Sequence, residues 1–363
     1  MIAKNKPKIL LITDDFSATY YLGFYYPLRS RQSTLTCRIL SRQDIMNSTS
    51  ATNPDIFFED ILNLEKPDLV IFNRYSLPHG ELIIEKCQQH SIKTVYFIDD
   101  DLLQIPTNLG NAIQNTHGKE EVVIARKYLL ENVNLVWTST AYLQERLSQQ
   151  ISQANFICGG YPPYLEGLIA SRKFFSQFNF ARNQQSKKVI FGYMGSKGHQ
   201  KDLEKILPSI KTILQHFPQT HFQTFGTVAM PDELKLFGDR VSSHKVISSY
   251  HKFLEYLYNL DWKLGLAPLE NTEFNRCKTP VKYLEYTACN IPTLASNVVV
   301  YNQFHDNREI IIVEDNQWYD KISCALCHSK MQADLLNNAQ KRCRQQFSLA
   351  SQQNQIKTIL KML

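Results

Sequence analysis

Short apolar runs alternate with amphipathic segments along most of the chain, and this alternation limits the fold more than any other feature. The run KILLIT at 8–13 is apolar almost throughout, as expected of a strand covered on both faces. Comparable runs occur at 67–72, 93–98, 134–138, 155–158, 188–193, 221–227, 245–247, 262–269, 293–296 and 309–313. Strands that alternate with helices form parallel sheets through βαβ units. We therefore predict two α/β halves, with the polar, weakly patterned stretch at 172–188 as the linker.

Charged side chains follow three of the first-half runs. Asp14 follows the first run, Arg74 comes shortly after the second, and 99–101 is a run of three aspartates directly after the third. Ligands of open α/β sheets bind beyond the carboxyl ends of the strands. These residues are therefore candidates for a ligand pocket.

The acidic triplet has three interpretations. Asp99 and Asp100 can be catalytic or acceptor-binding carboxylates in a cleft. The triplet can instead solvate its loop and cap the following turn. Asp99 and Asp101 can also provide hard oxygen ligands for a divalent cation, as in metal-dependent GT-A glycosyltransferases. The pattern is too short to distinguish these alternatives.

A short helix with marked ends is predicted between the apolar runs at 262–269 and 293–296. Thr279 is suited to cap its first turn, because its hydroxyl can accept a hydrogen bond from a free amide. Pro280 fits the first helical position. Asn290 tolerates the left-handed conformation that ends a helix.

This helix start is suited to an anion. Free amides and the positive end of the helix dipole favour a phosphate there. Lys278 and Lys282 add two cations nearby, and Glu285 lies about one turn deeper. A carboxylate at that depth can accept hydrogen bonds from sugar hydroxyls. The segment therefore predicts a site for a phosphorylated, hydroxyl-rich ligand.

A glycine-containing loop at 194–203 leads from the run at 188–193 into an amphipathic helix. Glycines let backbone amides approach a phosphate closely, and a helix start adds its dipole. Gly195, Ser196, His199 and Lys201 are the candidate contacts in this loop. The alternative is a turn with no ligand.

The segment from 261 to 296 resembles the nucleotide-sugar site of GT-B glycosyltransferases, in particular the large retaining family called GT4. The sequence EYTACNIP at 285–292 matches the family's ribose-binding Glu and the turn that follows it. The family often has another Glu eight positions earlier, where this chain has Cys277, and a subgroup has a Lys next to that place, like Lys278. The resemblance implies an α/β fold, GT-B, with two Rossmann-like domains whose parallel sheets face each other across a cleft.

The resemblance also implies a division of the chain. Residues 1–180 would form the acceptor-side domain, and residues 181–345 the nucleotide-sugar-binding domain. Residues 346–363 would form a terminal helix that crosses back to the first domain.

Roles for individual residues follow from the same resemblance. Asp99, Asp100 and Lys278 would be catalytic, and Asp14 and Arg74 would lie on the acceptor side. The short strand at 245–247 would border the donor base. The donor contacts would be Gly195, Ser196, His199, Lys201, Val246, Lys278, Thr279, Lys282 and Glu285.

The implied reaction moves a sugar from a nucleoside-diphosphate sugar to an acceptor hydroxyl with retention. The acceptor would be a carbohydrate, a lipid-linked glycan or a protein, in a setting such as cell-surface polysaccharide assembly. GT-B enzymes seldom use a metal, so no cofactor is expected. Two alternatives remain: a catalytically silent GT-B nucleotide-binding module, because Cys277 departs from the motif, and a metal-dependent GT-A-like transferase using Asp99 and Asp101.

Composition restricts partners and location. The net charge of +6 is dispersed, which disfavours a nucleic-acid partner but permits contact with an anionic membrane surface. No run of 18 apolar residues suggests a membrane span, and the N-terminus lacks the pattern of a signal peptide. Eight scattered cysteines fit a reducing compartment. We expect a cytoplasmic protein that can work at the inner face of a membrane.

Overall fold

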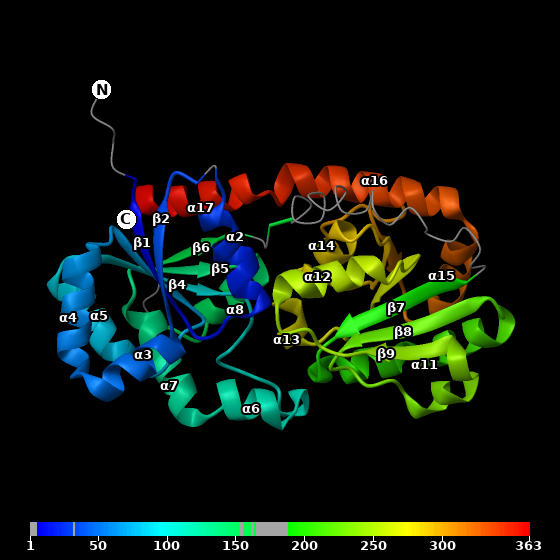
Figure 1. Cartoon of the computed structure of the whole chain (residues 1–363), viewed down its shortest axis with the longest axis horizontal. Coiled ribbons are helices and arrows are strands. Elements are labelled where there is room, and N and C mark those ends of the chain that lie inside the picture. Colours follow the sequence, from blue (N-terminus) through cyan, green and yellow to red (C-terminus); the bar gives the residue numbers. More distant parts are fainter. Residues whose placement is uncertain (1–5, 32, 153–154, 161–162, 165–187) are drawn as a thin grey trace.

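The computed structural model describes residues 6–31, 33–152, 155–160, 163–164 and 188–363. Within these ranges the chain forms two α/β halves, each built on a six-stranded parallel sheet (Figure 1). The predicted linker and the predicted domain boundary at 180/181 lie almost entirely outside the described residues.

The first sheet has the strand order β2-β1-β3-β4-β5-β6. Its strands are β1 (Lys8–Thr13), β2 (Thr36–Ser41), β3 (Leu69–Asn73), β4 (Lys93–Ile98), β5 (Leu135–Thr138) and β6 (Phe156–Cys158). Its helices are α1 (Ala18–Tyr20), the π-helix η1 (Tyr21–Tyr25), α2 (Tyr26–Arg29), α3 (Arg42–Ala51), α4 (Pro54–Glu65), α5 (Gly80–Gln89), the 3₁₀ turn η2 (Thr107–Leu109), α6 (Asn111–His117), α7 (Glu120–Asn132) and α8 (Ala141–Ser148).

The second sheet has the strand order β12-β11-β10-β7-β8-β9. Its strands are β7 (Val189–Gly195), β8 (Thr220–Gly226), β9 (Val241–His244), β10 (Leu264–Ala267), β11 (Thr293–Ser296) and β12 (Ile311–Val313). The 3₁₀ segments are η3 (Lys197–His199) and η4 (Asp232–Arg240). The helices are α11 (Gln200–His216), α12 (Tyr250–Asn259), α13 (Glu273–Arg276), α14 (Val281–Ala288), α15 (Trp318–Cys327), α16 (Ser329–Gln346) and α17 (Leu349–Met362).

These two parallel sheets confirm the predicted α/β fold class. The central strands are buried on both faces, as their apolar sequences predict: in β3 every residue is buried. One strand was not predicted, β2, because it lies at the edge of the sheet and its first four residues alternate between exposed and half-buried positions. Pro208 lies inside α11, and the helix continues through it.

The predicted strand at 245–247 is wrong, because β9 lies earlier and ends at His244. The last pair of its ladder joins Phe225 to His244. The next residue of β8, Gly226, has φ +114 and turns the chain away from the sheet. In the described residues β8, the strand that pairs with β9, does not continue beside Lys245, and Val246 lies in the loop after β9 and is 54% exposed.

The C-terminal helices span both halves along one side of the molecule (Figure 1). α16 packs beside α14 in the second half, and α17 lies on the first sheet. Ile356 and Ile359 of α17 belong to the core formed by β1 and its neighbours. The Gln352 side-chain amide donates to the Gly23 carbonyl at 2.9 Å. α17 is therefore part of the first half's core.

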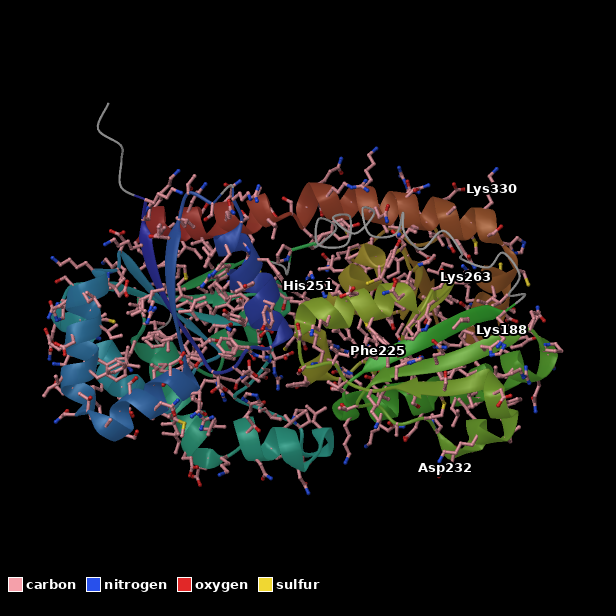
Figure 2. The ribbon with its side chains drawn as sticks, viewed as in Figure 1. Lys188, Phe225, Asp232, His251, Lys263 and Lys330 are labelled. Carbon is pink, nitrogen blue, oxygen red and sulfur yellow. The ribbon has the colours of Figure 1, made fainter. Side chains whose placement is uncertain are left out.

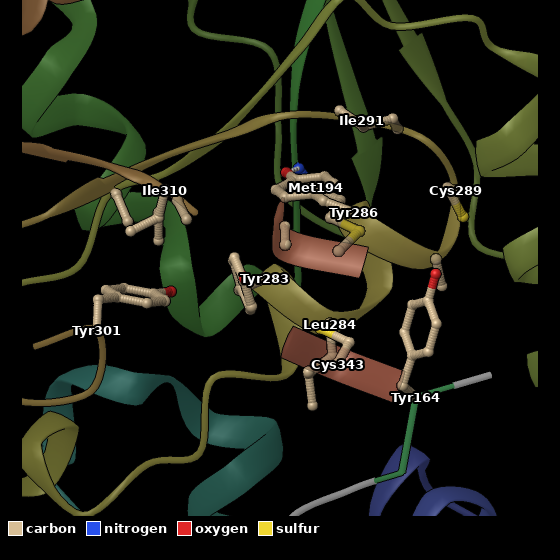
Figure 3. Packing of buried hydrophobic residues seen from close by; sticks show 14 of the residues in the cluster. Tyr164, Met194, Tyr283, Leu284, Tyr286, Cys289, Ile291, Tyr301, Ile310 and Cys343 are labelled. Atoms are coloured by element: carbon tan, nitrogen blue, oxygen red, sulfur yellow. Dashed lines mark hydrogen bonds between the residues drawn. The ribbon is translucent and has the colours of Figure 1, made fainter. Parts of the chain in front are cut away.

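Helix α14, which carries the predicted ligand-binding residues Lys282 and Glu285, is held in place by packing against the second sheet. The Tyr286 hydroxyl accepts a hydrogen bond from the Met194 amide and donates one to the Leu266 carbonyl, each at 3.0 Å. Its ring lies against Gly265, where a Cβ would come within 2.8 Å of the ring. Figure 3 shows Tyr286 beside Met194 in this core. The pairing explains why residue 265 is a glycine and holds α14 across the carboxyl ends of β7 and β10.

The two halves meet where the carboxyl ends of their central strands lie. His251 on α12 and Phe225 at the end of β8 lie on the side of the second half that faces the first (Figure 2). Tyr21 of η1 stacks on Tyr250 of α12, with ring centroids 5.7 Å apart and an interplanar angle of 11°. Among the described helices, none is both long and apolar enough to cross a membrane.

Candidate active site

Parallel pairing of β3 with β1 and β4 brings the predicted strand-end residues to one edge of the first sheet. Arg74, directly after β3, lies with its Nε 3.0 Å from an Asp99 oxygen and its Nη2 2.7 Å from an Asp100 oxygen. Thr19 donates a hydrogen bond to the other Asp99 oxygen at 2.6 Å. One guanidinium therefore holds two neighbouring carboxylates.

Burial and neighbouring charges move the pKa values of the two carboxyls apart. Burial raises the pKa of Asp99, and the charge of Arg74 offsets this only in part. Burial also acts to raise the pKa of Asp100, but Lys278 and Arg74 outweigh it and hold the pKa below its usual value. Asp100 therefore stays ionised at neutral pH, while Asp99 binds a proton more readily than an ordinary aspartate.

Asp14 lies further along the same edge and does not touch this cluster. Its carboxylate faces Arg42 at 3.5 Å and His117 at 3.6 Å. Burial raises the pKa of Asp14. Burial and the charges of Arg74 and Arg126 lower the pKa of His117 to about 4, so this histidine is neutral near pH 7.

Lys278 connects the first half to the second. Its ammonium lies 3.3 Å from an Asp100 oxygen and 4.7 Å from the centre of the Phe274 ring. One residue earlier, the Cys277 carbonyl accepts a hydrogen bond from the Thr140 hydroxyl at 3.0 Å. The loop before α14 is therefore attached to the first half next to the carboxylate pair.

The start of α14 differs from the prediction. The helix begins at Val281, and Pro280 occupies the N-cap position with no side-chain hydrogen bond to the first turn. The Val281 amide donates to the Thr279 carbonyl at 2.9 Å, two residues back, with Pro280 at φ −79 and ψ 45. This is the geometry of an inverse γ-turn. Thr279 therefore lies one residue before the N-cap position and does not cap the helix with its hydroxyl.

The other end of α14 confirms the prediction. Asn290 has φ +62, in the left-handed region, and Pro292 follows two residues later. The helix thus spans eight residues, with Lys282 in its first turn and Glu285 in its second.

Lys282 is half-buried and Glu285 is buried in α14. Burial lowers the pKa of Lys282 to about 8, although Asp202, Glu285 and Asp100 favour its charged form. Burial raises the pKa of Glu285 to about 7. The Lys282 ammonium, which loses its proton easily, and the Glu285 carboxyl, which is easily protonated, therefore lie one turn apart. A ligand with a negative charge and hydroxyl groups could stabilise the charged form of each.

Tyr250 holds Glu285 in place. Its hydroxyl donates a 2.6 Å hydrogen bond to a Glu285 oxygen. Because Tyr250 stacks on Tyr21, this contact also connects Glu285 to the first half. The sequence analysis missed Tyr250 as a site residue, because a tyrosine at the start of an amphipathic helix carries no signal of its own.

The glycine loop lies beside α14. Gly195 ends β7, exposed Ser196 precedes η3, and the His199 Nδ1 lies 2.6 Å from an Asp202 oxygen. The charge of Lys282 and burial lower the pKa of His199 to about 4, despite the contact with Asp202. His199 is therefore a neutral group next to two lysines. Asp202 was not predicted, although its spacing of three residues from His199 on a helix start could have indicated the pair.

The acidic triplet is not arranged as a metal site. Asp99 and Asp100 are held by cations, and Asp101, which is fully buried, pairs with Arg146 of α8. Arg146 also lies 2.6 Å from Glu273 of the second half. In the described parts of the chain no three His, Cys, Asp or Glu side chains gather in a way that could hold an ion. The pairing of Asp99 and Asp101 with separate arginines does not fit the GT-A-like alternative.

Cys277 occupies the position where GT4 enzymes often have a Glu. Its side chain is fully buried, and burial raises the pKa of the thiol to about 12. The thiol lies 3.4 Å from the Glu273 carbonyl. Cys277 therefore presents no charge to the site.

Comparison with known proteins identifies the fold. The sequence matches no family model and no curated protein. The structure is similar to Anabaena Alr3699/HepE in complex with UDP and glucose, with a TM-score of 0.65 at 13% identity over 98% of this chain and 100% of that one. A glycosyltransferase from Rickettsia africae ESF-5 gives a TM-score of 0.65 at 12% identity, with 99% of each chain covered. WaaG, a glycosyltransferase involved in lipopolysaccharide biosynthesis, gives a TM-score of 0.58 at 13% identity. The match covers 97% of this chain and 99% of that one.

These similarities confirm that the chain has the GT-B glycosyltransferase fold. It spans nearly the whole length of these three structures, so both halves of the fold are present.

The pKa of Glu285 leads to a prediction about stability. Its value rises from 4.5 to about 7 on folding, so the ionised side chain destabilises the fold fully above pH 7, and the penalty disappears as the pH falls to 4.5. We expect Glu285→Gln to raise the free energy of unfolding at pH 8 by up to about 3 kcal/mol. The gain should be near zero at pH 4.5. Urea unfolding at both pH values measures it, with exposed Glu204→Gln as the matched control. An equal gain at both pH values would contradict the argument.

Proposed function

We propose that the chain is a glycosyltransferase that uses a nucleoside-diphosphate sugar as donor. One observation carries the proposal: a helix start with Lys278 and Lys282 lies one turn from buried Glu285 and directly opposite the Asp99–Asp100 pair. In our proposal the two lysines bind an anion, Glu285 binds hydroxyl groups, and Asp99 and Asp100 are the catalytic carboxylates. The similar HepE structures are complexes with UDP and glucose, with UDP, and with UDP-glucose, which supports this choice of donor.

In this proposal the diphosphate lies against the amides of the α14 start and the ammonium groups of Lys278 and Lys282. Gly195, Ser196 and His199 border it from the other side, and Glu285 accepts hydrogen bonds from the donor ribose. Val246, exposed in the loop after β9, lies toward the donor base. Two lysines supply the positive charge that a metal ion would otherwise supply, so we propose that the donor binds without one.

The negative charge that develops on the leaving diphosphate determines the roles of the charged residues in the proposed step. The bond between the anomeric carbon and the diphosphate oxygen breaks, and a bond to the acceptor oxygen forms. The leaving diphosphate gains negative charge, which Lys278 and Lys282 stabilise more in the transition state than in the ground state. Asp99, whose pKa is raised by burial, is suited to take the acceptor proton, whereas Asp100 stays ionised beside Lys278.

The finer parts of the proposal come from the GT4 resemblance: retention of configuration, an acceptor hydroxyl on a carbohydrate, lipid-linked glycan or protein, and a role in cell-surface polysaccharide assembly. All eight cysteines are free, which supports a reducing location such as the cytoplasm. Contact with a membrane surface is part of the same proposal, because lipid-linked acceptors would be presented there.

A nucleotide panel tests the proposal. We expect one of UDP, GDP and ADP, without added metal, to raise the melting temperature of wild type and to bind by calorimetry. Glu285→Ala should lower that affinity at least about tenfold, because it removes a buried acceptor for two ribose hydroxyls. Glu204→Ala on the exposed face of α11 is the control. No binding to wild type by any of the three nucleotides would reject the donor site.

A silent nucleotide-binding module is the second candidate, and Cys277 is the observation that favours it. A buried neutral thiol replaces a carboxylate of the family motif. Nucleotide binding without release of nucleoside diphosphate from the matching nucleotide sugar, in the presence of a broad acceptor panel, would support the module over the enzyme.

A further inference from the structure

Two exposed cysteines lie close together at the end of helix α15. Cys324 and Cys327 are both free and both exposed. They are three residues apart on the helix, so their Cα atoms lie about 5 Å apart. Disulfides join Cα atoms that are about 4.4–6.8 Å apart. Because the helix ends at Cys327, its last turn can adjust to a bond between the two sulfurs.

His328, the residue after this pair, lies against Cys324. Its Nδ1 is 2.7 Å from the Cys324 carbonyl oxygen and 3.7 Å from the Cys324 sulfur. A carbonyl oxygen can only accept a hydrogen bond, so Nδ1 carries a proton. The same N–H group is close enough to donate to a thiolate at Cys324 when that thiolate attacks a neighbouring sulfur.

Cys327 also lines a hollow in the second half. The volume of the hollow is about 600 Å³, within the range of small-molecule sites. The segment before β12, the end of α15 and the start of α16 form its wall, and Cys324 is not among the described residues of that wall. Lys330, another wall residue, lies at the end of the second half that is remote from the first half (Figure 2). The hollow is therefore separate from the proposed donor site.

The wall of this hollow offers two cations to a ligand. Arg308 and Lys330 are exposed, and across the described residues neither side chain makes an ion pair or a hydrogen bond. Asp334 is the single acid among the described wall residues, so the cations outnumber it. Met331 and Leu335 form an apolar part of the wall. A small anion with carboxylate groups fits this wall, and its sulfur atom would meet Cys327.

We propose that Cys327 is a site of reversible modification by the disulfide of a small anionic thiol, and that Cys324 resolves the product. First, the Cys327 thiolate attacks one sulfur of the small disulfide, forms a mixed disulfide and releases one thiolate. Next, the Cys324 thiolate attacks the Cys327 sulfur, the Cys324–Cys327 disulfide forms and the second thiolate leaves. The two released thiolates take up the two protons of the protein thiols, so the protein is oxidised by two electrons and the small disulfide is reduced. The inference does not depend on the proposed function, because neither cysteine lies in the donor site.

Thiol–disulfide exchange on the full chain tests the site. Oxidised glutathione, a disulfide rich in carboxylates, is the probe, and neutral hydroxyethyl disulfide is the comparison. Mass spectrometry of the intact chain and of its peptides identifies each product and its rate. We compare wild type with Cys324→Ser, Cys327→Ser and Arg308→Met. Arg31→Met, at an exposed arginine of the first half, is the matched control.

Wild type should form the Cys324–Cys327 disulfide, and reduced glutathione should reverse it. Cys324→Ser should stop at one glutathione on Cys327, whereas Cys327→Ser should form neither product. Exposed Cys158 should react with oxidised glutathione about tenfold more slowly than Cys327, because it lies outside the hollow. Arg308→Met should lower the rate at Cys327 about fivefold with oxidised glutathione and less than about twofold with hydroxyethyl disulfide. Lys330→Met is a second variant with the same expected result, in case Arg308→Met disturbs the loop.

Three results would overturn the inference. Equal rates at Cys158 and Cys327 would mean that exposure alone decides the reaction. A mixed disulfide in wild type that never closes to the Cys324–Cys327 bond would remove Cys324 from its resolving role. Unchanged rates with oxidised glutathione in both Arg308→Met and Lys330→Met would show that the hollow does not bind the anion.

Discussion

Replacing Lys282 with methionine is expected to lower kcat/KM for sugar transfer by about 1,000-fold. Lys282 lies in the first turn of α14, and its burial lowers its pKa to about 8. Because this cation is half-buried, water screens its action on a leaving diphosphate less than it would screen a surface charge. Methionine keeps most of the length of the side chain and removes only the charge. Steady-state kinetics with the nucleotide sugar chosen by the binding panel measure the effect.

The pH dependence of nucleotide binding separates a lost charge from a disturbed helix. In wild type the affinity for the nucleoside diphosphate should fall above pH 8, because Lys282 loses its proton there. Lys282→Met should bind more weakly below pH 8 and lack this fall, so that the affinities of variant and wild type converge as the pH rises further. Lys330→Met is the control, because Lys330 lies on α16 far from the site (Figure 2). Wild-type affinity in Lys282→Met, with the same pH profile, would remove Lys282 from the donor site.

Some strands that are buried on both faces could be predicted to the residue, although the fully buried β3 and β10 each begin two residues later than their predicted runs at 67–72 and 262–269. The predicted runs at 8–13, 93–98 and 293–296 are β1, β4 and β11 with identical bounds. The edge strands were harder, because half of each faces solvent and its sequence is no longer a continuous apolar run. β2 was missed for this reason. β9 was placed too late, because its two exposed serines give it no apolar run, whereas Val246 and Ile247 just after it are apolar although they are exposed and half-buried.

The candidate site could be predicted where parallel-sheet geometry decides it. Residues that follow neighbouring parallel strands must meet at one edge, and Arg74 indeed contacts both Asp99 and Asp100. Contacts that depend on how a helix is oriented could not be predicted. Tyr250 reaches Glu285, and Arg146 reaches Asp101, only because the helices that carry them pack in one particular orientation.

Thr279 shows the limit of local rules. Threonine before proline is a good helix-start pattern, yet the chain forms an inverse γ-turn through Pro280 at this place. Thr140 before α8 has a similar sequence signal and does cap its helix, accepting from the Leu143 amide at 3.2 Å. The difference lies in the surroundings, because the loop before Thr279 is fixed to the first half through the Cys277 carbonyl and Lys278.

Replacing Arg74 with methionine is expected to lower the free energy of unfolding by about 3–5 kcal/mol at pH 7. Arg74 is the shared partner of two buried, adjacent carboxylates, and its side chain is 14% exposed. Without the guanidinium, Asp99 and Asp100 face each other with Lys278 as the nearest cation. Urea unfolding followed by the fluorescence of Trp137, which is buried in the same sheet, measures the loss. Arg38→Met, at a surface pair with Glu65, is the control and should cost less than about 1 kcal/mol.

The loss should depend on pH with a defined sign. In wild type Lys278 and Arg74 hold the pKa of Asp100 below its usual value, so its stabilising contribution is present at neutral pH and is lost only in acid, as the pH falls through that lowered pKa. In Arg74→Met the pKa values of the carboxylate pair rise, and protonation of one carboxyl relieves the repulsion. The difference between wild type and variant should therefore be largest near pH 7 and shrink toward pH 4. Asp99→Asn added to Arg74→Met should restore part of the stability at pH 7, because it removes one of the unpaired charges. A double variant less stable than Arg74→Met alone would contradict charge repulsion as the cause and indicate lost packing around Arg74 instead.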